Sequence, residues 1–344
     1  MKKILVVCAA LMLPCLLVHA QEADNTTKEE GIVLNVIPRI DLNPVFSTAK
    51  GGDNDFNWGN TAFYTLFEGN LADNLSFSVE NHWFREKPKG LYKNIGHSDD
   101  VNFIDWAYLT LTLGNWEISA GKQMITTGGF EFDDYDFDVH SELQSGLWNT
   151  LACYQWGAKV GWNVSETTYF GGQITTSPLA EKFFKGGLFT YSGEWRGTYG
   201  NFSTISSITF IQGTKLGKGT KFMDCFAKLL AVGLRYDAEP VVLTMDVFNK
   251  VGANDEMLGG WTIMPSADWT VNDNLGLIFK ASLERTKNDI PDVKKNAITA
   301  GVAAHWFPLK DKGLRLHATC AYNNRFETMT LSAGVLYNFS LKVK

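Results

Sequence analysis

Apolar and polar residues alternate along almost the whole chain, in stretches of roughly ten residues. A β-strand turns successive side chains to opposite faces, so each stretch predicts a strand with one apolar face and one polar face. A closed membrane barrel explains this pattern directly, because lipid lies outside, water lies inside and no sheet edge stays open. The final stretch is the clearest case, and its apolar face consists of Met329, Leu331, Ala333, Val335, Tyr337, Phe339, Leu341 and Val343.

The alternating stretches predict about sixteen antiparallel strands. Two of them, 225–237 and 257–270, have the weakest pattern, and Pro265 falls inside the second, where a ladder hydrogen bond is lost unless a bulge intervenes. Pro38 poses the same difficulty in the first strand. The predicted strands are 32–47, 57–71, 74–85, 101–113, 115–124, 151–164, 166–176, 186–199, 202–212, 225–237, 240–250, 257–270, 274–286, 295–307, 313–322 and 327–343.

Short and long connections alternate between these strands. An even strand number with tight turns at one end and longer loops at the other is typical of outer-membrane barrels. The sequence therefore predicts an all-β fold, a transmembrane antiparallel β-barrel over residues 32–344, with both ends and all tight turns on the periplasmic side. The tight turns are predicted at Ala72-Asp73, Gly114, Ser165, Gly200-Asn201, Ala238-Glu239, Asn272-Asp273 and Pro308–Lys312.

Aromatic residues recur close to the predicted tight turns and to the C-terminus. In membrane barrels, aromatic rings gather in a girdle at the boundary between hydrocarbon and headgroups. The recurring aromatics are therefore predicted to form one such girdle. The residues concerned are Trp116, Trp162, Tyr199, Phe202, Tyr236, Trp269, Trp306 and Phe339.

The first twenty residues predict export. Met1-Lys2-Lys3 is basic, Ile4–Leu17 is apolar, and Val18-His19-Ala20 resembles a small-residue cleavage site. We therefore expect a cleaved signal peptide at 1–20 and a flexible, polar leader at 21–31. An exported barrel belongs in the outer membrane of a Gram-negative bacterium, where membrane lipid and lipopolysaccharide would surround it.

Composition excludes several other classes of protein. The net charge of -6 and the pI near 5.6 argue against a nucleic-acid partner. Outside the signal peptide there are three widely spaced cysteines, Cys153, Cys225 and Cys320, which predict neither a disulfide framework nor a CxxC metal site. No cofactor is predicted.

Strand parity places many charged residues on the face opposite the apolar one. Such charges would be ruinous in a dry core but are expected along a water-filled pore; the alternative is that they only solvate the wall and pair across strands. The acidic candidates are Asp41, Glu68, Glu80, Glu117, Glu194, Asp246 and Glu284. The basic candidates for the pore wall are Arg39, Lys122, Lys159, Arg196, Arg235, Lys280 and Arg315.

Lys122 shares the parity of the lipid-facing Trp116 and Ile118, so strand parity alone would not place it on the pore wall. Either a bulge at Gly121 turns Lys122 inward, or Lys122 pairs with Asp105 across the hairpin. The bulge is the preferred interpretation.

The long connection 125–150 interleaves acids with aromatics and contains no Lys or Arg. The aromatics indicate a segment folded back against the barrel, so we predict an inward-folded third extracellular loop whose acids face the basic wall and constrict the pore. A calcium site is the alternative, but EF-hand spacing is missing and no metal is predicted. The acids are Glu131, Asp133, Asp134, Asp136, Asp138 and Glu142.

The stretch Asp105–Asp138, DWAYLTLTLGNWEISAGKQMITTGGFEFDDYDFD, resembles the phosphate-selective porin O and P family, particularly its relatives in Bacteroidetes-type bacteria. The resemblance rests on the AYLTL strand, the WEISAGKQ strand and the GGFEFD opening of the long loop. It implies a 16-stranded outer-membrane porin, usually a homotrimer, whose third extracellular loop narrows the pore. This chain departs from the family's ladder of arginines, because its lumenal arginines are few and matched by acids.

These features together predict a porin for passive diffusion of small hydrophilic solutes or ions. The alternative is a non-conducting barrel that binds a ligand or partner through its extracellular loops. An enzyme is not predicted, because no GxSxG or HExxH motif occurs. His305, Arg315 and His317 should cluster on the lumenal side of one hairpin, because positions 305 and 315 are expected to lie opposite each other. No acid or serine completes a catalytic triad there.

Overall fold

The computed structural model describes residues 33–52, 54–58, 61–85, 104–133, 141–146, 153–180, 187–215, 217, 221–251, 260–285, 296–310, 312–338 and 341–343. The predicted signal peptide and leader lie outside these residues, and the second of two compact units, Val33–Lys344, contains all of them. No helix among the described residues is long and apolar enough to cross a membrane.

The described residues form one antiparallel sheet of nineteen strands, with two short 3-10 helices, η1 (Ser141–Leu143) and η2 (Phe222–Cys225). The strands are β1 (Val33–Leu42), β2 (Val45–Ala49), β3 (Asp55–Asn57), β4 (Ala62–Ala72), β5 (Leu75–Arg85), β6 (Ile104–Leu113), β7 (Trp116–Met124), β8 (Tyr154–Ser165), β9 (Thr168–Thr176), β10 (Phe189–Tyr199), β11 (Phe202–Gln212), β12 (Phe226–Ala238), β13 (Val241–Val251), β14 (Trp261–Asn272), β15 (Leu275–Arg285), β16 (Asn296–Trp306), β17 (Leu314–Asn323), β18 (Thr328–Asn338) and β19 (Leu341–Val343).

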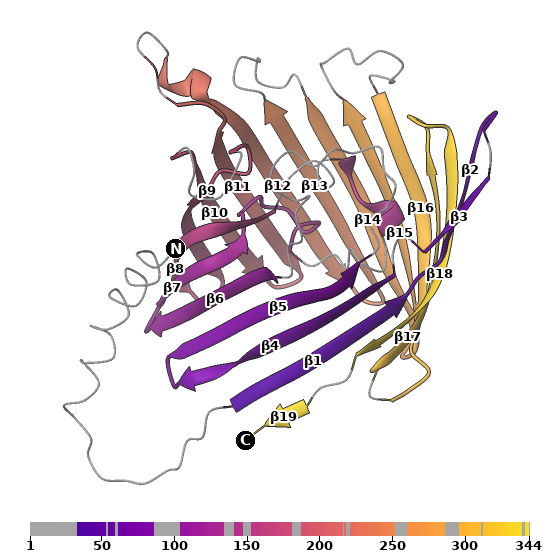
Figure 1. Ribbon diagram of the computed structural model, residues 1–344, viewed down its shortest axis with the longest axis horizontal. Coiled ribbons are helices and arrows are strands. Elements are labelled where there is room, and N and C mark those ends of the chain that lie inside the picture. The colour runs from indigo at the N-terminus through magenta and orange to yellow at the C-terminus, as the bar shows by residue number, and fades with distance from the viewer. Residues whose placement is uncertain are drawn as a thin grey trace. The chain divides into compact units, whose positions relative to one another are not determined.

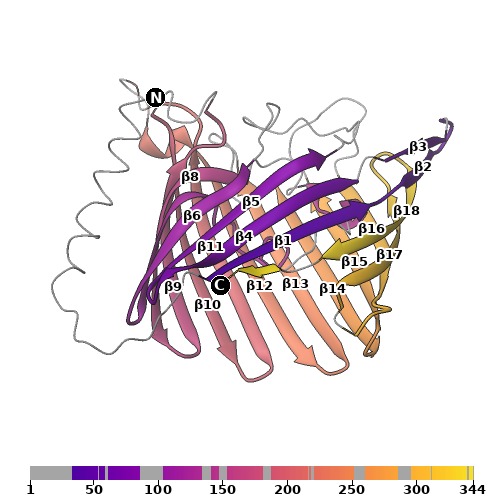
Figure 2. The ribbon, with the colours of Figure 1, turned by 60° about the horizontal axis from the view of Figure 1, so that its bottom comes forward.

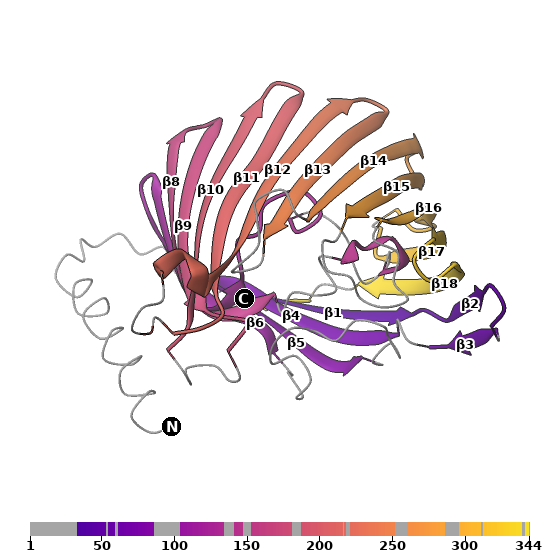
Figure 3. The same ribbon diagram turned by 90° about the horizontal axis from the view of Figure 1, so that it is seen from above.

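The sheet closes on itself because β1 pairs with β4 on one side and with β18 on the other (Figures 1 and 3). Nineteen described strands less the three short ones, β2, β3 and β19, leave sixteen in the wall. β2 follows β1 after a break at Asn43-Pro44 and pairs with β18 and β3, whereas β19 pairs with the start of β1. The predicted fold class, an antiparallel barrel of sixteen strands, is confirmed.

Short connections alternate with longer ones around the barrel, and Figure 2 shows the hairpins that join β10 to β11 and β12 to β13 at one end. All seven predicted tight connections are present, at 73–74, 114–115, 166–167, 200–201, 239–240, 273–274 and 307–313.

The outward face of the wall is apolar and carries aromatic side chains near both ends. Trp116 and Trp162 stack at a centroid distance of 5.4 Å beside two short turns. On β10, Tyr191 and Tyr199 are both exposed and lie eight residues apart, about 27 Å along a strand and about 20 Å across the barrel wall at a tilt of about 40°. Two rows of rings at this spacing match the edges of an outer-membrane apolar band. The second row includes Trp83, Trp156, Tyr191 and Tyr322.

A buried pair lies beside the seam where β1 meets β18. The side chains of Asp41 on β1 and His317 on β17 are completely buried, and Asp41 Oδ1 is 2.9 Å from His317 Nε2. Gly334 on β18 lies between them, and a Cβ at this position would be 2.5 Å from the imidazole. Glycine at 334 therefore lets a side chain from β17 reach across β18 to β1.

We expect Gly334→Ala to destabilise the barrel by about 1–3 kcal/mol, because the added methyl group overpacks this site. Electrophoresis of samples heated to increasing temperatures measures the loss of the compact folded band. Gly172→Ala on β9 is the matched control, since nothing lies within 4 Å of a Cβ there. Equal melting of both variants would contradict the proposed role of Gly334.

Candidate functional site

The inner face of the wall is polar where the outer face is apolar. On β10, Phe189, Tyr191 and Trp195 are exposed, whereas Thr190 and Glu194 between them are buried. The buried residues face the inside of the closed sheet, because neighbouring side chains on a strand point to opposite faces.

The residues that follow β7 lie against this polar face. The backbone N–H of Thr126 donates to Gln173 Oε1 at 2.8 Å, and Gln173 Nε2 donates to the Met124 carbonyl at 2.9 Å. Thr209 Oγ1 donates to the Thr126 carbonyl at 2.6 Å. Side chains from β9 and β11 thus supply the hydrogen bonds that this irregular backbone needs.

Two adjacent glycines bring the segment into close contact with the wall. Gly128 and Gly129 have φ angles of 70° and 77°, in the left-handed region that favours glycine. A Cβ on Gly129 would lie 2.6 Å from the ring of Phe248, and one on Gly128 would lie 2.5 Å from Ser207 Oγ. Both the backbone conformation and the space therefore require glycine here.

Asp246 on β13 holds the next two residues. Its Oδ1 accepts a hydrogen bond from Phe130 N at 2.9 Å, and its Oδ2 accepts one from Glu131 N at 2.7 Å. The Phe130 ring lies under the guanidinium of Arg235, 4.0 Å from its central carbon. A carboxylate bound by two backbone N–H groups fixes the direction of the chain at this point.

Phe132 anchors the same segment by apolar packing. It belongs to a buried cluster with Cys153, Ile211, Leu229, Ala231, Phe248 and Met264, and its ring meets that of Phe248 edge-on at 5.5 Å. Burial, aided by the charges of Asp105 and Glu131, raises the pKa of Cys153 to about 12. Cys153 therefore remains a neutral thiol and acts as a small apolar side chain.

A buried ion pair joins Glu131 to β15, two strands along the wall from Asp246. Lys280 Nζ on β15 lies 2.7 Å from Glu131 Oε1, with exposures of only 4% and 1% for the two side chains. Ser145 adds two hydrogen bonds to Glu131, from its N at 2.8 Å and from its Oγ at 2.6 Å. The pair thus connects 125–133 to 141–146 as well as to β15.

The helix η1 is attached to the last strands of the barrel. Leu143 packs in a second buried cluster with Ile278, Ala303 and Ala321, on β15, β16 and β17. The N–H of Gly146 donates to Glu284, whose other oxygen is 3.7 Å from Arg325 Nη2. Both described parts of 125–150 are therefore anchored to the inner face.

Asp133 meets the wall at a charged cavity. Arg196 binds it with two contacts, from Nη2 at 2.7 Å and from Nη1 at 2.8 Å, and also contacts Glu194 at 3.1 Å. Lys159 pairs with the same Glu194. These residues and Glu117 line a cavity of about 250 Å³ between the segment and β6–β11. Its lining has three carboxylates and two cations, so it is charged but nearly balanced.

The structure brings two of the predicted acid–base sets together, Glu131 with Lys280 and Asp133 with Arg196. Arg39 stacks over the Tyr64 ring at 5.9 Å, Arg315 lies opposite Leu336 on β18, and Glu142 is half-buried in η1. Asp134, Asp136 and Asp138 lie outside the described residues. The assignment of this set to a pore remains a prediction.

The predicted bulge at Gly121 is wrong. β7 keeps an unbroken register through Gly121 and Lys122 with both of its neighbours, and the irregularity occurs instead at Asp105 between β5 and β6. Lys122 is 2% exposed and donates to the carbonyl of Ile104. Gly121 is required for a different reason, since its φ is 137° and a Cβ would lie 2.2 Å from the carbonyl of Ala107.

The histidines on β16 and β17 only partly follow the prediction. His305 lies directly opposite His317 in the β16–β17 register, so the predicted pairing of positions 305 and 315 is wrong by two residues. His317 Nε2, however, is paired with Asp41 on β1, an acid that strand-by-strand reasoning did not connect with it.

Comparisons with known proteins bear on the fold. No family model matches the chain, and no curated protein matches it in sequence. Among solved structures, the outer membrane channel DcaP of Acinetobacter baumannii is 13% identical, covers 92% of this chain and 100% of its own, and has a TM-score of 0.60.

Two porins of known structure have similar sequence identities, coverages and TM-scores. OmpF of Salmonella typhi, in complex with daunomycin, is 13% identical, with coverages of 91% and 99% and a TM-score of 0.64. An anion-selective porin from Comamonas acidovorans is 12% identical, with coverages of 89% and 99% and a TM-score of 0.63. This chain therefore has the barrel fold of outer-membrane channels and porins.

Proposed function

We propose that the protein is an outer-membrane porin, a water-filled channel for passive diffusion of small hydrophilic solutes or ions. The observation that carries this proposal is the division of a closed sixteen-strand wall into an apolar outer face and an inner face with ionised side chains. Charges inside such a barrel are stable when water fills it.

Residues 125–150 form the constriction in this proposal. Their described parts are held at the inner face by Asp246, by the Glu131–Lys280 pair and by the Asp133–Arg196 pair. A segment anchored at several points keeps a fixed conformation while solutes pass, and a size filter requires a constriction of constant width. Because the acids and bases near the cavity are nearly balanced, we expect weak charge selectivity rather than a phosphate filter.

The same proposal assigns the surroundings of the barrel. The two rows of exposed rings, near Tyr191 and Tyr199, would lie at the membrane interfaces, with lipid and lipopolysaccharide outside. The resemblance to phosphate-selective porins O and P supports assembly as a homotrimer. The basic start, apolar core and small-residue site within residues 1–20 support export by a cleaved signal peptide.

Recording from single molecules in a planar bilayer tests the channel. Purified protein should give discrete conductance steps in potassium chloride, because the lumen holds water and mobile ions. Silence at all voltages, together with saturable binding of a ligand to the loops, would instead support a non-conducting barrel.

A further inference from the structure

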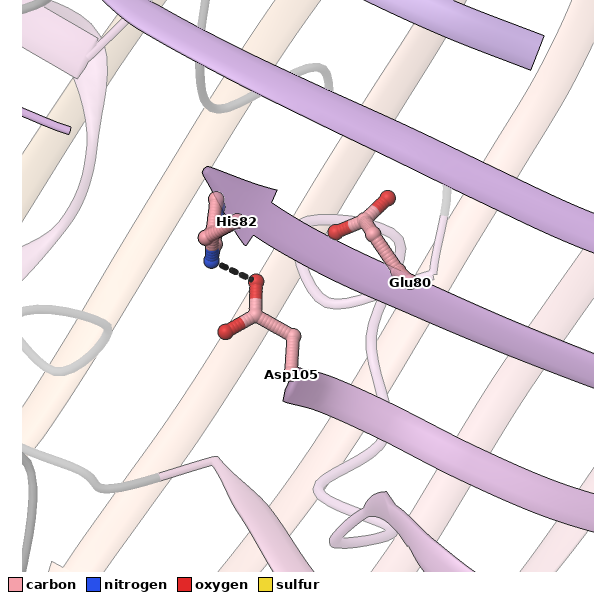
Figure 4. Close-up of side chains that lie close together, drawn as sticks. All are labelled: Glu80, His82 and Asp105. Carbon is pink, nitrogen blue, oxygen red and sulfur yellow. Dashed lines mark ion pairs between the residues drawn. The ribbon is translucent and has the colours of Figure 1, made fainter. Parts of the chain in front are cut away.

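Three side chains with metal-binding atoms converge on the first strands of the wall. Glu80 and His82 lie on β5 and Asp105 on β6, and Figure 4 shows them gathered at the facing ends of the two strands. One donor atom from each residue lies within 4.8 Å of the donor atoms of the other two. Among the described residues, this is the one group of three or more His, Cys, Asp or Glu side chains that is so close together.

The local backbone explains the convergence. Residues two apart on a strand point to the same face, which places Glu80 beside His82. The register between β5 and β6 shifts where Glu80 pairs with Trp106 while Asn81 pairs with Ile104, so Asp105 has no partner across the ladder. A bulge of this kind re-aims the side chain of its extra residue. Here it turns the carboxylate of Asp105 to His82.

The imidazole of His82 is held in place on one side only. Its Nδ1 is 2.6 Å from Asp105 Oδ2, and its ring lies against that of Tyr64 with centroids 4.0 Å apart. Its Nε2 is buried and has no hydrogen-bond partner among the described residues. A buried polar nitrogen without a partner is uncommon and costly. A cation held between Nδ1, Asp105 and Glu80 would take the place of the proton that Nδ1 shares with Asp105.

From this geometry we propose that Glu80, His82 and Asp105 bind a divalent first-row transition-metal cation. One imidazole nitrogen and two carboxylates suit zinc, nickel, copper or manganese better than calcium, which prefers oxygen ligands alone. Metal–ligand bonds of about 2.1 Å place neighbouring ligand atoms about 3 Å apart. Donor atoms that lie up to 4.8 Å apart therefore move closer on binding, whereas His82 Nδ1 and Asp105 Oδ2, at 2.6 Å, separate slightly.

Exposure and charge set the expected strength of this site. The side chains of His82 and Asp105 are 13% and 12% exposed, so a cation can reach them without unfolding of the wall. The two carboxylates attract a cation. The ammonium of Lys122 opposes that attraction, because it is bonded to the carbonyl of Ile104, next to Asp105. We therefore expect moderate affinity, and stronger binding after Lys122→Met.

The test uses the full-length protein refolded in detergent without lipopolysaccharide. Calorimetric titration with nickel or copper should give one saturable site per chain. His82→Gln and Glu80→Gln should each weaken binding at least about tenfold, since loss of even a second-layer partner costs about 10–100-fold. The electron paramagnetic resonance spectrum of bound copper should show coupling to the nitrogen of one imidazole, which His82→Gln removes.

His317→Gln is the matched control, because His317 also pairs with a buried aspartate, at 2.9 Å, but belongs to no described group of three donors. It should leave the titration unchanged. Heat-dependent migration in electrophoresis verifies that each variant is folded. If His82→Gln does not fold, the binding measured for Glu80→Gln tests the proposed site. No saturable binding to the wild type, or undiminished binding in folded His82→Gln or Glu80→Gln, would overturn the proposal.

Discussion

Replacing Lys280 with methionine is expected to release the segment 125–133 from β15 and to raise the single-channel conductance. The change leaves Glu131 buried at 1% side-chain exposure without its cation. Breaking a buried pair on one side costs about 3–5 kcal/mol. The segment can avoid this cost by moving Glu131 into water, which widens the lumen. Planar-bilayer recordings and the size limit for sugar uptake into liposomes measure the effect.

Two further variants make this result specific to the buried pair. Lys50→Met also removes a lysine–glutamate pair, but its lysine is 79% exposed and its partner Glu327 is 3.5 Å away; it should change conductance little, because exposed pairs contribute about 0–1 kcal/mol. The double variant Glu131→Gln, Lys280→Met buries no lone charge and should conduct more like the wild type. Wild-type conductance in Lys280→Met itself would show that the pair does not hold the constriction.

Neutralising Asp133, Asp134 and Asp136 together is expected to shift ion selectivity toward anions by severalfold. Asp133 binds the guanidinium of Arg196 with two contacts at the edge of the 250 Å³ cavity. Without that carboxylate, the positive charge of Arg196 faces the lumen and attracts anions over short distances. The reversal potential in a potassium chloride gradient measures the shift, which should shrink at high salt.

Arg196 supplies the internal control. Changing Asp133→Asn and Arg196→Gln together removes one charge of each sign, so the reversal potential should return close to the wild-type value. A reversal potential that does not respond to the triple acid variant would place these acids away from the ion path.

The strands and their faces were predictable because each depends on neighbours within about ten residues. The alternation in the final stretch identified β18, and the turn signals located every short hairpin. Even the weak stretch around Pro265 became a strand. Pro265 lies opposite Met245 on β13, and the described ladder from β14 to β15 simply omits Met264 and Pro265 without a shift in register. Neighbouring strands on both sides compensate for one missing donor.

Contacts across the barrel could not be predicted in the same way. Parity placed Asp246 on the inner face, but its partners Phe130 and Glu131 are more than a hundred positions away, and Glu131 and Lys280 are separated by 149. No local pattern specifies which of several inward acids meets a backbone N–H. The same limit explains the error at Gly121: parity can detect that a strand is irregular, but the register of the neighbouring strand decides where the extra residue lies.

Closure of the wall through β1 and β18 has a consequence for biogenesis. Asp41 pairs with Leu336, and 336 minus 41 gives a separation of 295 positions, so the final ladder forms only after nearly all of the polypeptide is available. Until then β1 and the last strand added to the sheet are open edges with unpaired backbone groups, a template for association with other chains. A chain that ends before β18 should therefore aggregate. The full-length chain is exposed to the same risk until β1 and β18 pair, and a chaperone that binds it during this period would prevent aggregation.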